Sequence, residues 1–291
     1  MRRTLDPVDR AAPRPYPNAT LICRSGPVDF QDILFDVEGG IALLTLNRPD
    51  KLNAMTWNTF AEIEHALRFA EDDDAVKVLL ITGAGRGFSA GTDLTRPADA
   101  PEPQRPFPGR RGMMRSPFLL PEQVYRFPKP SIAAVNGVCV GAGLSLALST
   151  DIRIAAEEAR FSAIFVKRAI PPDTGTSWFL PRLVGRENAL KMIYTGRMVP
   201  APEAKEIGLV SEVVPLADLM ARARDLAGEI ARGPSVAIEI ARSLVTQGLD
   251  RPLEDQVLLE QFTQTITAKT EDIEEGRRSF LERREPRFQG R

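Results

Sequence analysis

Two turns rich in small residues carry the chemistry that this sequence suggests most directly. They are Phe88-Ser-Ala-Gly-Thr-Asp-Leu94 and Asn136-Gly-Val-Cys-Val-Gly-Ala-Gly-Leu144, which follow apolar runs typical of buried strands at 76–82 and 131–135. We expect each turn to open a helix, whose first N–H groups lack partners and lie at the positive end of the helix dipole. Two such turns on adjacent strands would aim two N–H groups at one oxygen, which is the requirement for an oxyanion hole.

Composition excludes several other kinds of site. The chain has 291 residues, a net charge of −1, two distant cysteines and a single histidine, His65. The near-neutral charge argues against nucleic acid or an anionic membrane as a partner, and no apolar stretch approaches the roughly 20 residues that span a bilayer. One histidine, placed off the apolar stripe of its expected helix, excludes a Ser-His-Asp triad and a multi-histidine zinc site. We expect no metal, no disulfide framework and a cytoplasmic location.

The elements that must position the two turns alternate between strands and helices. A hairpin is expected at 33–38 and 41–46 around Gly39-Gly40, then a helix to about 71 and a strand at 151–155. This pattern predicts an α/β fold with a C-terminal helical region, whose helices are expected at 202–208, 216–232, 234–248, 252–268 and 271–284. Residues 1–29 are expected to form a flexible extension, 30–200 the core and 201–291 the helical region. The proline-rich segment 95–130 is expected to be a loop that covers the site.

Motifs in a fixed order give the sequence a family resemblance. It resembles the enoyl-CoA hydratase/isomerase family, the crotonase superfamily, from about residue 30 to 290. The matching segments are 46–49, 88–94, 129–137, 141–143, 150–152, 180–185, 204–210 and 275–284. The resemblance implies a spiral of ββα units, a homotrimer or a hexamer made of two trimers, and an acyl-CoA thioester as substrate. Coenzyme A would be part of that substrate, and no separate cofactor is expected.

The resemblance also implies roles for residues around the two turns. The backbone N–H groups of Thr92 and Ala142 would bind the thioester oxygen, where one donor is worth roughly 2.7–4 kcal/mol. Asp93 is a candidate ligand contact, and its carboxylate is expected to orient the turn or cap the helix that follows. The CoA and the acyl group would contact Lys51 (phosphates), Leu52, Ala54, Ala90 and Leu94 (adenine), Gly91, Val140, Gly141, Ser145 and Phe165, with Phe280 and Arg283 supplied by a neighbouring subunit. Core packing of Phe280 and a plain surface charge at Arg283 are the alternatives.

The sequence departs from the hydratases of this family at their two glutamates. Ser145 and Phe165 stand at those positions, and neither side chain can take the role of a carboxylate. Asp173 lies in a Pro-Asp-x-Gly turn that resembles one used by ring-modifying isomerases of the family. Desolvation near Phe165 and Trp178 would raise its pKa and make it a better proton acceptor. A purely structural role in the turn is the alternative.

Three readings of the function are open, and a fourth, a dehalogenase, is disfavoured because that branch of the family also needs a histidine and His65 is misplaced. The first is an enoyl-CoA isomerase in which Asp173 removes a proton from one carbon and returns it two carbons along. The second is a hydratase or acyl-CoA hydrolase that uses Asp173 alone or with a loop acid such as Glu122. The third is a catalytically silent CoA-binding protein. Apolar residues at 107, 113, 114, 118, 127 and 165 are candidates to line a pocket for a bulky or aromatic acyl group, and packing without ligand contact is the alternative for each of them.

Overall fold

A six-stranded sheet forms the centre of the molecule. The computed structural model describes residues 21–23, 26–28, 30–95 and 119–291. The strands of this sheet lie in the order β12-β9-β7-β5-β4-β3, and every pair is parallel except the hairpin of β3 and β4. Their bounds are Ile33–Glu38 (β3), Ile41–Leu46 (β4), Val78–Gly83 (β5), Ser131–Val135 (β7), Ile152–Ala156 (β9) and Glu212–Val214 (β12). The predicted hairpin is therefore confirmed.

A second sheet lies at one end of the first and holds both small-residue turns. It has the order β11-β10-β8-β6, from strands Gly87–Ser89 (β6), Val138–Val140 (β8), Arg160–Ser162 (β10) and Val199–Pro200 (β11). The pairs β5 and β6, β7 and β8, and β9 and β10 each pass from the large sheet to the small one. A helix follows β8 directly, and another follows β10 after a short 3-10 helix. This repetition confirms the predicted spiral of ββα units.

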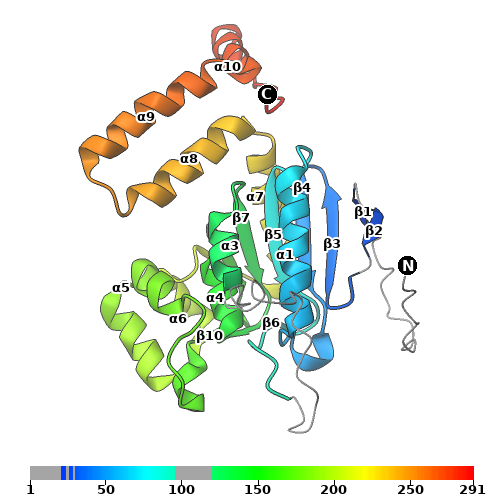
Figure 1. The fold of residues 1–291 in the computed structure, drawn as a ribbon, viewed down its shortest axis with the longest axis vertical. Coiled ribbons are helices and arrows are strands. Elements are labelled where there is room, and N and C mark those ends of the chain that lie inside the picture. Colours follow the sequence, from blue (N-terminus) through cyan, green and yellow to red (C-terminus); the bar gives the residue numbers. More distant parts are fainter. Residues whose placement is uncertain (1–20, 24–25, 29, 96–118) are drawn as a thin grey trace, which may run out of the picture.

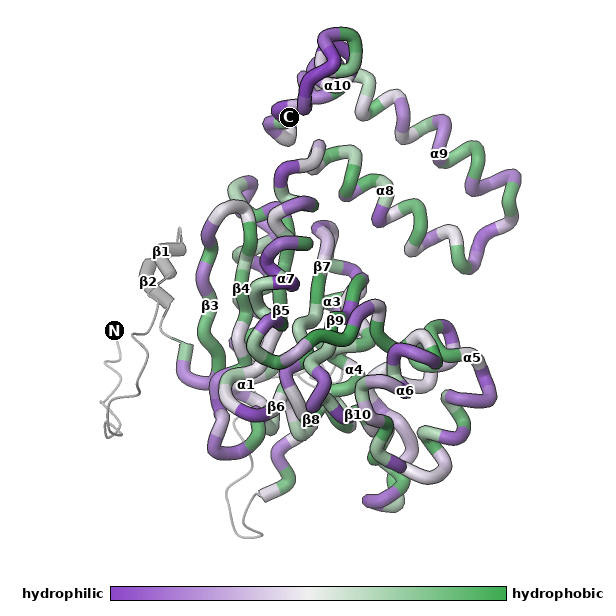
Figure 2. Tube along the Cα trace, turned by 180° about the vertical axis from the view of Figure 1, so that it is seen from behind, coloured by the Kyte–Doolittle hydropathy of each residue, from purple (hydrophilic) through white to green (hydrophobic). Residues whose placement is uncertain are grey.

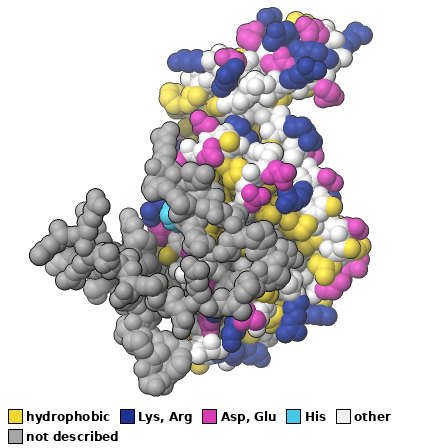
Figure 3. Space-filling model, turned by 90° about the vertical axis from the view of Figure 1, so that its right-hand side faces the viewer, with side chains coloured by type: hydrophobic (Ala, Val, Ile, Leu, Met, Phe, Trp, Pro, Cys, Tyr) yellow, Lys and Arg dark blue, Asp and Glu magenta, His cyan; other side chains and the backbone are white. Residues whose placement is uncertain are grey.

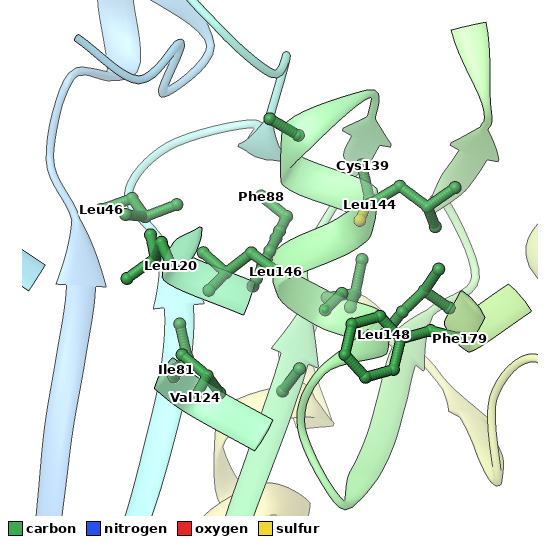
Figure 4. Packing of buried hydrophobic residues seen from close by; sticks show 14 of the residues in the cluster. Leu46, Ile81, Phe88, Leu120, Val124, Cys139, Leu144, Leu146, Leu148 and Phe179 are labelled. Carbon is green, nitrogen blue, oxygen red and sulfur yellow. The ribbon is translucent and has the colours of Figure 1, made fainter. Parts of the chain in front are cut away.

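Helices cover both faces of the large sheet (Figure 1). Helix α7 (Leu216–Ala231) packs on one face through Leu219, Ala223 and Ala227. The other face is covered by α1 (Trp57–Asp72), α3 (Leu120–Arg126) and α4 (Ala142–Leu148). The strands of this core are mostly hydrophobic along their length in Figure 2. Leu120 and Val124 of α3 belong to the same buried cluster as Leu146 of α4 and Phe88 (Figure 4).

The C-terminal helices extend away from this core. Helices α5 (Thr176–Thr195) and α6 (Ala201–Glu206) stay beside the small sheet. We call α8 (Ser235–Gly248), α9 (Leu253–Thr267) and α10 (Glu271–Glu282) the C-terminal arm, which projects from the sheets in Figure 1. The predicted helices of this region are confirmed to within a few residues. Helix α9 has no buried residue, and hydrophobic side chains lie at the surface of the arm in Figure 3. The expected division at residue 200 stays a prediction.

Three expectations need correction. The first turn does not open a helix in the described residues up to Thr95, because Thr92 instead forms a parallel bridge with Met55. The expected loop at 95–130 contains helix α3, while 96–118 lies outside the described residues. Helix α5 was not predicted, since it contains Pro181 and is kinked at Gly185, where φ is 75°. Among the described residues, no helix is both long and apolar enough to cross a membrane.

The N-terminal extension contains a short antiparallel pair that the sequence did not predict. Strand β1 (Leu21–Cys23) pairs with β2 (Gly26–Val28). The rest of the extension, residues 1–20, 24–25 and 29, lies outside the described residues.

Candidate active site

The two small-residue turns lie against each other. A Cβ built on Gly91 would be 3.0 Å from the carbonyl oxygen of Val140 and 3.3 Å from the nitrogen of Ala142. Gly91 also has a φ of +88°, so a side chain there would meet both strain and a close neighbour. The sequence placed these two turns on adjacent strands, and β6 does pair with β8 in the small sheet. The residues proposed to bind a thioester oxygen therefore share one place in the fold.

The backbone N–H groups of Thr92 and Ala142 are both left without an internal acceptor. The N–H of Met55 donates to the Gly91 carbonyl at 2.7 Å, and the N–H of Asp93 donates to the Met55 carbonyl at 2.9 Å. The N–H of Thr92 therefore takes no part in the hydrogen bonds of this bridge. Ala142 is the first residue of α4, where an N–H has no partner within the helix. No residue in the described ranges accepts a hydrogen bond from either group.

An ion pair fixes the turn that carries Thr92. The guanidinium of Arg48 lies 2.9 Å from the carboxylate of Asp93 and 3.6 Å from that of Asp32. Asp32 in turn accepts hydrogen bonds of 2.7 Å from the hydroxyls of Thr56 and Thr59 at the start of α1. Desolvation raises the pKa of Asp93, but hydrogen bonds from Thr95 and Arg48 outweigh it and hold that pKa below its ordinary value. The role of Asp93 in orienting its turn stays a prediction.

The residues expected to contact the adenine lie on two neighbouring segments of the chain. The N–H of Ala90 donates to the Leu52 carbonyl at 2.8 Å, so the segment around Leu52 and Ala54 runs beside the first turn. Lys51 is exposed on the same segment, and Leu94 is 67% exposed. Leu52, Ala54 and Ala90 are half-buried on these segments, and their contact with the adenine stays a prediction.

Phe280 and Arg283 lie far from that surface within one chain. Both are exposed on and just after α10, at the opposite end of the molecule from β6 and α4 in Figure 1. Phe280 is 82% exposed, so its alternative role in core packing is wrong. A contact of these residues with CoA would require a second copy of the chain.

A cavity of about 610 Å³ opens between α3 and the start of α5. It holds two carboxylates, Asp173 and Glu122, and Glu122 is ion-paired with Arg126 at 2.9 Å. Its aromatic wall is a cluster in which the ring centroids of Trp178 and Phe179 are 4.9 Å apart, and Tyr125 lies edge-on to both. The lining residues are Leu119, Glu122, Tyr125, Arg126, Asp173, Thr174, Gly175, Trp178 and Phe179.

Asp173 lines this cavity and is exposed to solvent. Desolvation raises the pKa of Asp173 above its ordinary value, against opposing hydrogen bonds from its own N–H and from Thr174. Trp178 lines the same cavity, as expected, whereas Phe165 is buried in the hydrophobic core and is not part of the lining. A carboxylate with a raised pKa is a better proton acceptor than an ordinary one.

Ser145 belongs to a buried group of hydroxyls. Its Oγ lies 2.6 Å from the Oγ1 of Thr174 and 2.5 Å from the Oγ1 of Thr176. The sequence identified Ser145 only as a replaced glutamate and gave no sign of the two threonines. It also missed Tyr125 and Phe179, which periodicity alone cannot distinguish from core residues. Phe127, one of the expected acyl contacts, is a core residue, and residues 107, 113, 114 and 118 lie outside the described residues.

Comparison with known proteins agrees with this geometry. The family model for enoyl-CoA hydratase/isomerase matches residues 36–291. The chain is 38% identical over 262 residues to a 1,2-epoxyphenylacetyl-CoA isomerase of Escherichia coli, covering 89% of this chain and 98% of that protein. It is 34% identical over 260 residues to a crotonyl-CoA hydratase of Syntrophomonas wolfei, covering 89% and 98%.

A solved structure gives the same answer for the fold. The crystal structure of an enoyl-CoA hydratase from Bacillus anthracis superposes with a TM-score of 0.82 at 33% identity, covering 90% of this chain and all of that one (100%). The sequence motifs, the spiral of ββα units and these matches lead to one conclusion: the chain belongs to the enoyl-CoA hydratase/isomerase family, the crotonase superfamily.

Proposed function

We propose that this acyl-CoA enzyme is an enoyl-CoA isomerase in which Asp173 carries the proton. The observation that supports it most is the position of Asp173 at a cavity with an aromatic wall, while Ser145 and Phe165 stand where the hydratases have glutamates. A single carboxylate is sufficient for isomerisation, because the same group can accept a proton at one carbon and return it at another.

The proposed reaction uses the two turns and Asp173 together. The N–H groups of Thr92 and Ala142 would donate to the thioester oxygen of a 3-enoyl-CoA. The Asp173 carboxylate would remove a proton from the carbon next to the thioester, and the electron pair would move onto that oxygen to give a dienolate. Asp173 would then deliver the proton two carbons further along, which re-forms the thioester carbonyl and leaves the double bond conjugated with it. Atoms and charge balance without a cofactor or a second acid.

Hydration is the second candidate, because Glu122 lines the same cavity as Asp173. Two carboxylates on one cavity can divide water addition between a base and an acid. In this structure, however, the Glu122 carboxylate is occupied by the guanidinium of Arg126 on the same helix. This exposed pair is weak and can open, so the preference for isomerisation rests on its need for only one carboxylate.

We also propose that the acyl group is bulky or aromatic. The cavity volume is within the range of small-molecule sites, and three aromatic rings form its wall. Offset and edge-on contacts with such rings favour another aromatic group by about 0.5–1.5 kcal/mol beyond simple burial.

The assembly that we propose is a homotrimer or a pair of trimers. The C-terminal arm supports it, because Leu253, Leu258 and Phe262 of α9 are each more than 60% exposed in the single chain. Large exposed apolar side chains grouped on one element are typical of an interface between proteins. A neighbouring copy would then bring Phe280 and Arg283 to the CoA.

Mass-resolved turnover in D2O distinguishes these reactions. A 3-enoyl-CoA and a 2-enoyl-CoA would each be incubated with the enzyme and with the variants Asp173→Asn and Glu122→Gln. We expect double-bond migration with deuterium uptake and no gain of water, lost in Asp173→Asn and kept in Glu122→Gln. Water addition that depends on both residues would support the hydratase. Full turnover by Asp173→Asn would overturn the isomerase proposal, and no turnover of any enoyl-CoA would favour a silent CoA-binding protein.

A further inference from the structure

Ser89 carries a fully buried hydroxyl between the two small-residue turns. It is the last residue of β6, and its exposed fraction is 0%. Its Oγ donates to the carbonyl oxygen of Asn53 at 2.8 Å and accepts a hydrogen bond from the N–H of Gly91 at 3.2 Å. A carbonyl can only accept and an N–H can only donate, so the direction of both hydrogen bonds is fixed. The Ser89 side chain therefore links the first turn to the segment that contains Asn53.

The segment at 52–55 needs this side chain because its backbone departs from strand geometry. Leu52 and Asn53 have φ values of 49° and 55°, in the left-handed region that is uncommon for residues other than glycine. The carbonyl of Leu52 still accepts the N–H of Ala90 at 2.8 Å. Among the described residues, however, no backbone N–H donates to the Asn53 carbonyl. The Ser89 hydroxyl thus supplies a cross-link that backbone pairing leaves out.

The peptide between Gly91 and Thr92 turns this cross-link into the direction of a donor. Its carbonyl accepts from the Met55 N–H at 2.7 Å. The peptide is trans and planar, so the Thr92 N–H points away from its carbonyl and hence away from Met55. On the other side of the same Cα, the Ser89 hydroxyl holds the N–H of Gly91. A change in the φ of Gly91, which is +88°, would therefore break one of these two hydrogen bonds.

Ser89 also contacts the second turn. A Cβ built on Gly143 would lie 2.8 Å from the Ser89 Oγ, so the hydroxyl lies against the first turn of α4. The residue before Gly143 is Ala142, whose N–H is the other proposed donor. One side chain thus holds the first turn and touches the helix that carries the second donor.

We propose that Ser89 is a positioning residue whose hydroxyl orients the Thr92 N–H for the thioester oxygen. The proposal rests on the binding of that oxygen by Thr92 and Ala142 within the proposed function, and it does not depend on Asp173. Without the hydroxyl, the Asn53 carbonyl and the Gly91 N–H lose a buried partner, so the turn relaxes to find others. The Thr92 N–H moves with that relaxation, because it belongs to the next peptide along the chain.

The test is the infrared stretch of a bound thioester carbonyl. The probe is 3-phenylpropanoyl-CoA with 13C at that carbonyl, a saturated thioester that neither isomerises nor adds water. Hydrogen bonds to the oxygen weaken the C=O bond and lower its frequency. We expect wild type to lower it and Ser89→Ala to lose about half of that shift, since one of two donors is displaced. Ser149→Ala is the matched control, because its hydroxyl is 1% exposed and donates to the Leu146 carbonyl at 2.8 Å, at the other end of α4.

The kinetics of a 3-enoyl-CoA give a second readout. Ser89→Ala should lower kcat by about 10- to 100-fold and leave KM within about twofold, because the displaced donor acts on charge that develops in the transition state. A hydroxyl that only stabilised the fold would lower the thermal midpoint and leave both kcat and the carbonyl frequency unchanged. Ser149→Ala should show that second behaviour.

Each outcome has a definite meaning. A carbonyl shift that Ser89→Ala keeps in full would overturn the positioning role, and so would an equal loss in Ser149→Ala. If Ser89→Ala fails to fold, Ser89→Cys carries the same test, because a thiol is a weaker donor and acceptor. An unshifted carbonyl in wild type would refute the two donors and this proposal with them. A shift that is lost in Ser89→Ala, with no turnover of any enoyl-CoA, would refute the isomerase and still support the role of Ser89.

Discussion

Gly143 lies directly against Ser89, and this contact joins the first turn of α4 to the end of β6. A Cβ built on Gly143 would be 2.6 Å from the Cβ of Ser89 and 2.7 Å from its carbonyl oxygen. Real Cβ atoms do not approach so closely, so only glycine lets the two turns meet. The distance between the N–H groups of Thr92 and Ala142 thus depends on the absence of a side chain at Gly143.

Gly143→Ala should therefore damage both stability and activity. Inserting a methyl group into a packed site costs about 1–3 kcal/mol, and displacing two donors lowers kcat/KM by up to about 100-fold. Urea unfolding and turnover of a 3-enoyl-CoA measure the two effects. Gly276→Ala is the matched control, because its added Cβ meets nothing closer than 3.8 Å on helix α10. Equal behaviour of the two variants would contradict the tight contact.

Asp93→Asn should uncouple the first turn from Arg48. The pKa of Asp93 is lowered in the folded protein, so its stabilisation is present above the ordinary carboxyl pKa and disappears as the pH falls through the folded value. We expect a loss of about 1 kcal/mol near neutral pH that shrinks towards acid. Denaturant midpoints across that range check this, with the exposed Asp36→Asn as control. A deficit that stays constant with pH would argue against the ion pair.

Asp173→Asn should have the opposite effect on stability. A carboxyl whose folded pKa is raised contributes stability below its unfolded pKa and loses it as the pH rises through the folded value. The neutral amide avoids that loss, so the thermal midpoint near neutral pH should be unchanged or higher while turnover disappears. The difference in midpoint between wild type and variant should vanish in acid. A clearly lower midpoint at neutral pH would indicate that Asp173 is a structural residue of its turn.

Trp178→Ala should change which acyl group the enzyme prefers more than it changes the reaction that the enzyme catalyses. Trp178 lines the cavity and packs against Tyr125 and Phe179. We expect KM for an enoyl-CoA with a phenyl group to rise about tenfold, which corresponds to about 1.4 kcal/mol, with little change for a short straight chain. Tyr194→Ala is the control, since Tyr194 is exposed on the same helix and outside the cavity. An equal effect on both substrates would exclude an acyl contact.

Phe262→Lys should weaken the proposed assembly. Leu258, Phe262 and Ile266 are spaced four residues apart and are all exposed on α9, so they form one apolar stripe. A lysine in that stripe would place a charge in an interface, whereas Glu260→Lys lies on the opposite side of the helix. Light scattering after size exclusion should show dissociation only for Phe262→Lys. A wild-type monomer would contradict the proposed trimer directly.

The core elements were predictable because local chemistry and packing agree there. Gly39 and Gly40 have φ values of +58° and +83°, so the glycines that suggested a tight turn are the residues that make it. The C-terminal helices followed from their amphipathic spacing. Helix α5 was missed for the opposite reason: Pro181 and the non-helical Gly185 interrupt the pattern that predicts a helix.

The site was less predictable than the fold. The two turns could be recognised because glycine is required where backbones meet, as at Gly91. The helix expected after the first turn was wrong because the Met55 bridge, a contact distant in sequence, overrides local preference. The meeting of Glu122 with Asp173, and of Ser145 with Thr174 and Thr176, depends on how α3, α4 and α5 pack. No spacing in the sequence encodes those contacts.

The burial of α4 has a consequence for how the molecule moves. All seven of its residues are buried, whereas α9 buries none within the chain. Amide hydrogens of α4 should therefore exchange only when the whole protein unfolds, and those of α9 in a free chain should exchange through small local openings. Motions of the arm would therefore leave the helix that presents the Ala142 N–H undisturbed. The arm would thus open more readily than α4, which keeps its geometry between turnovers.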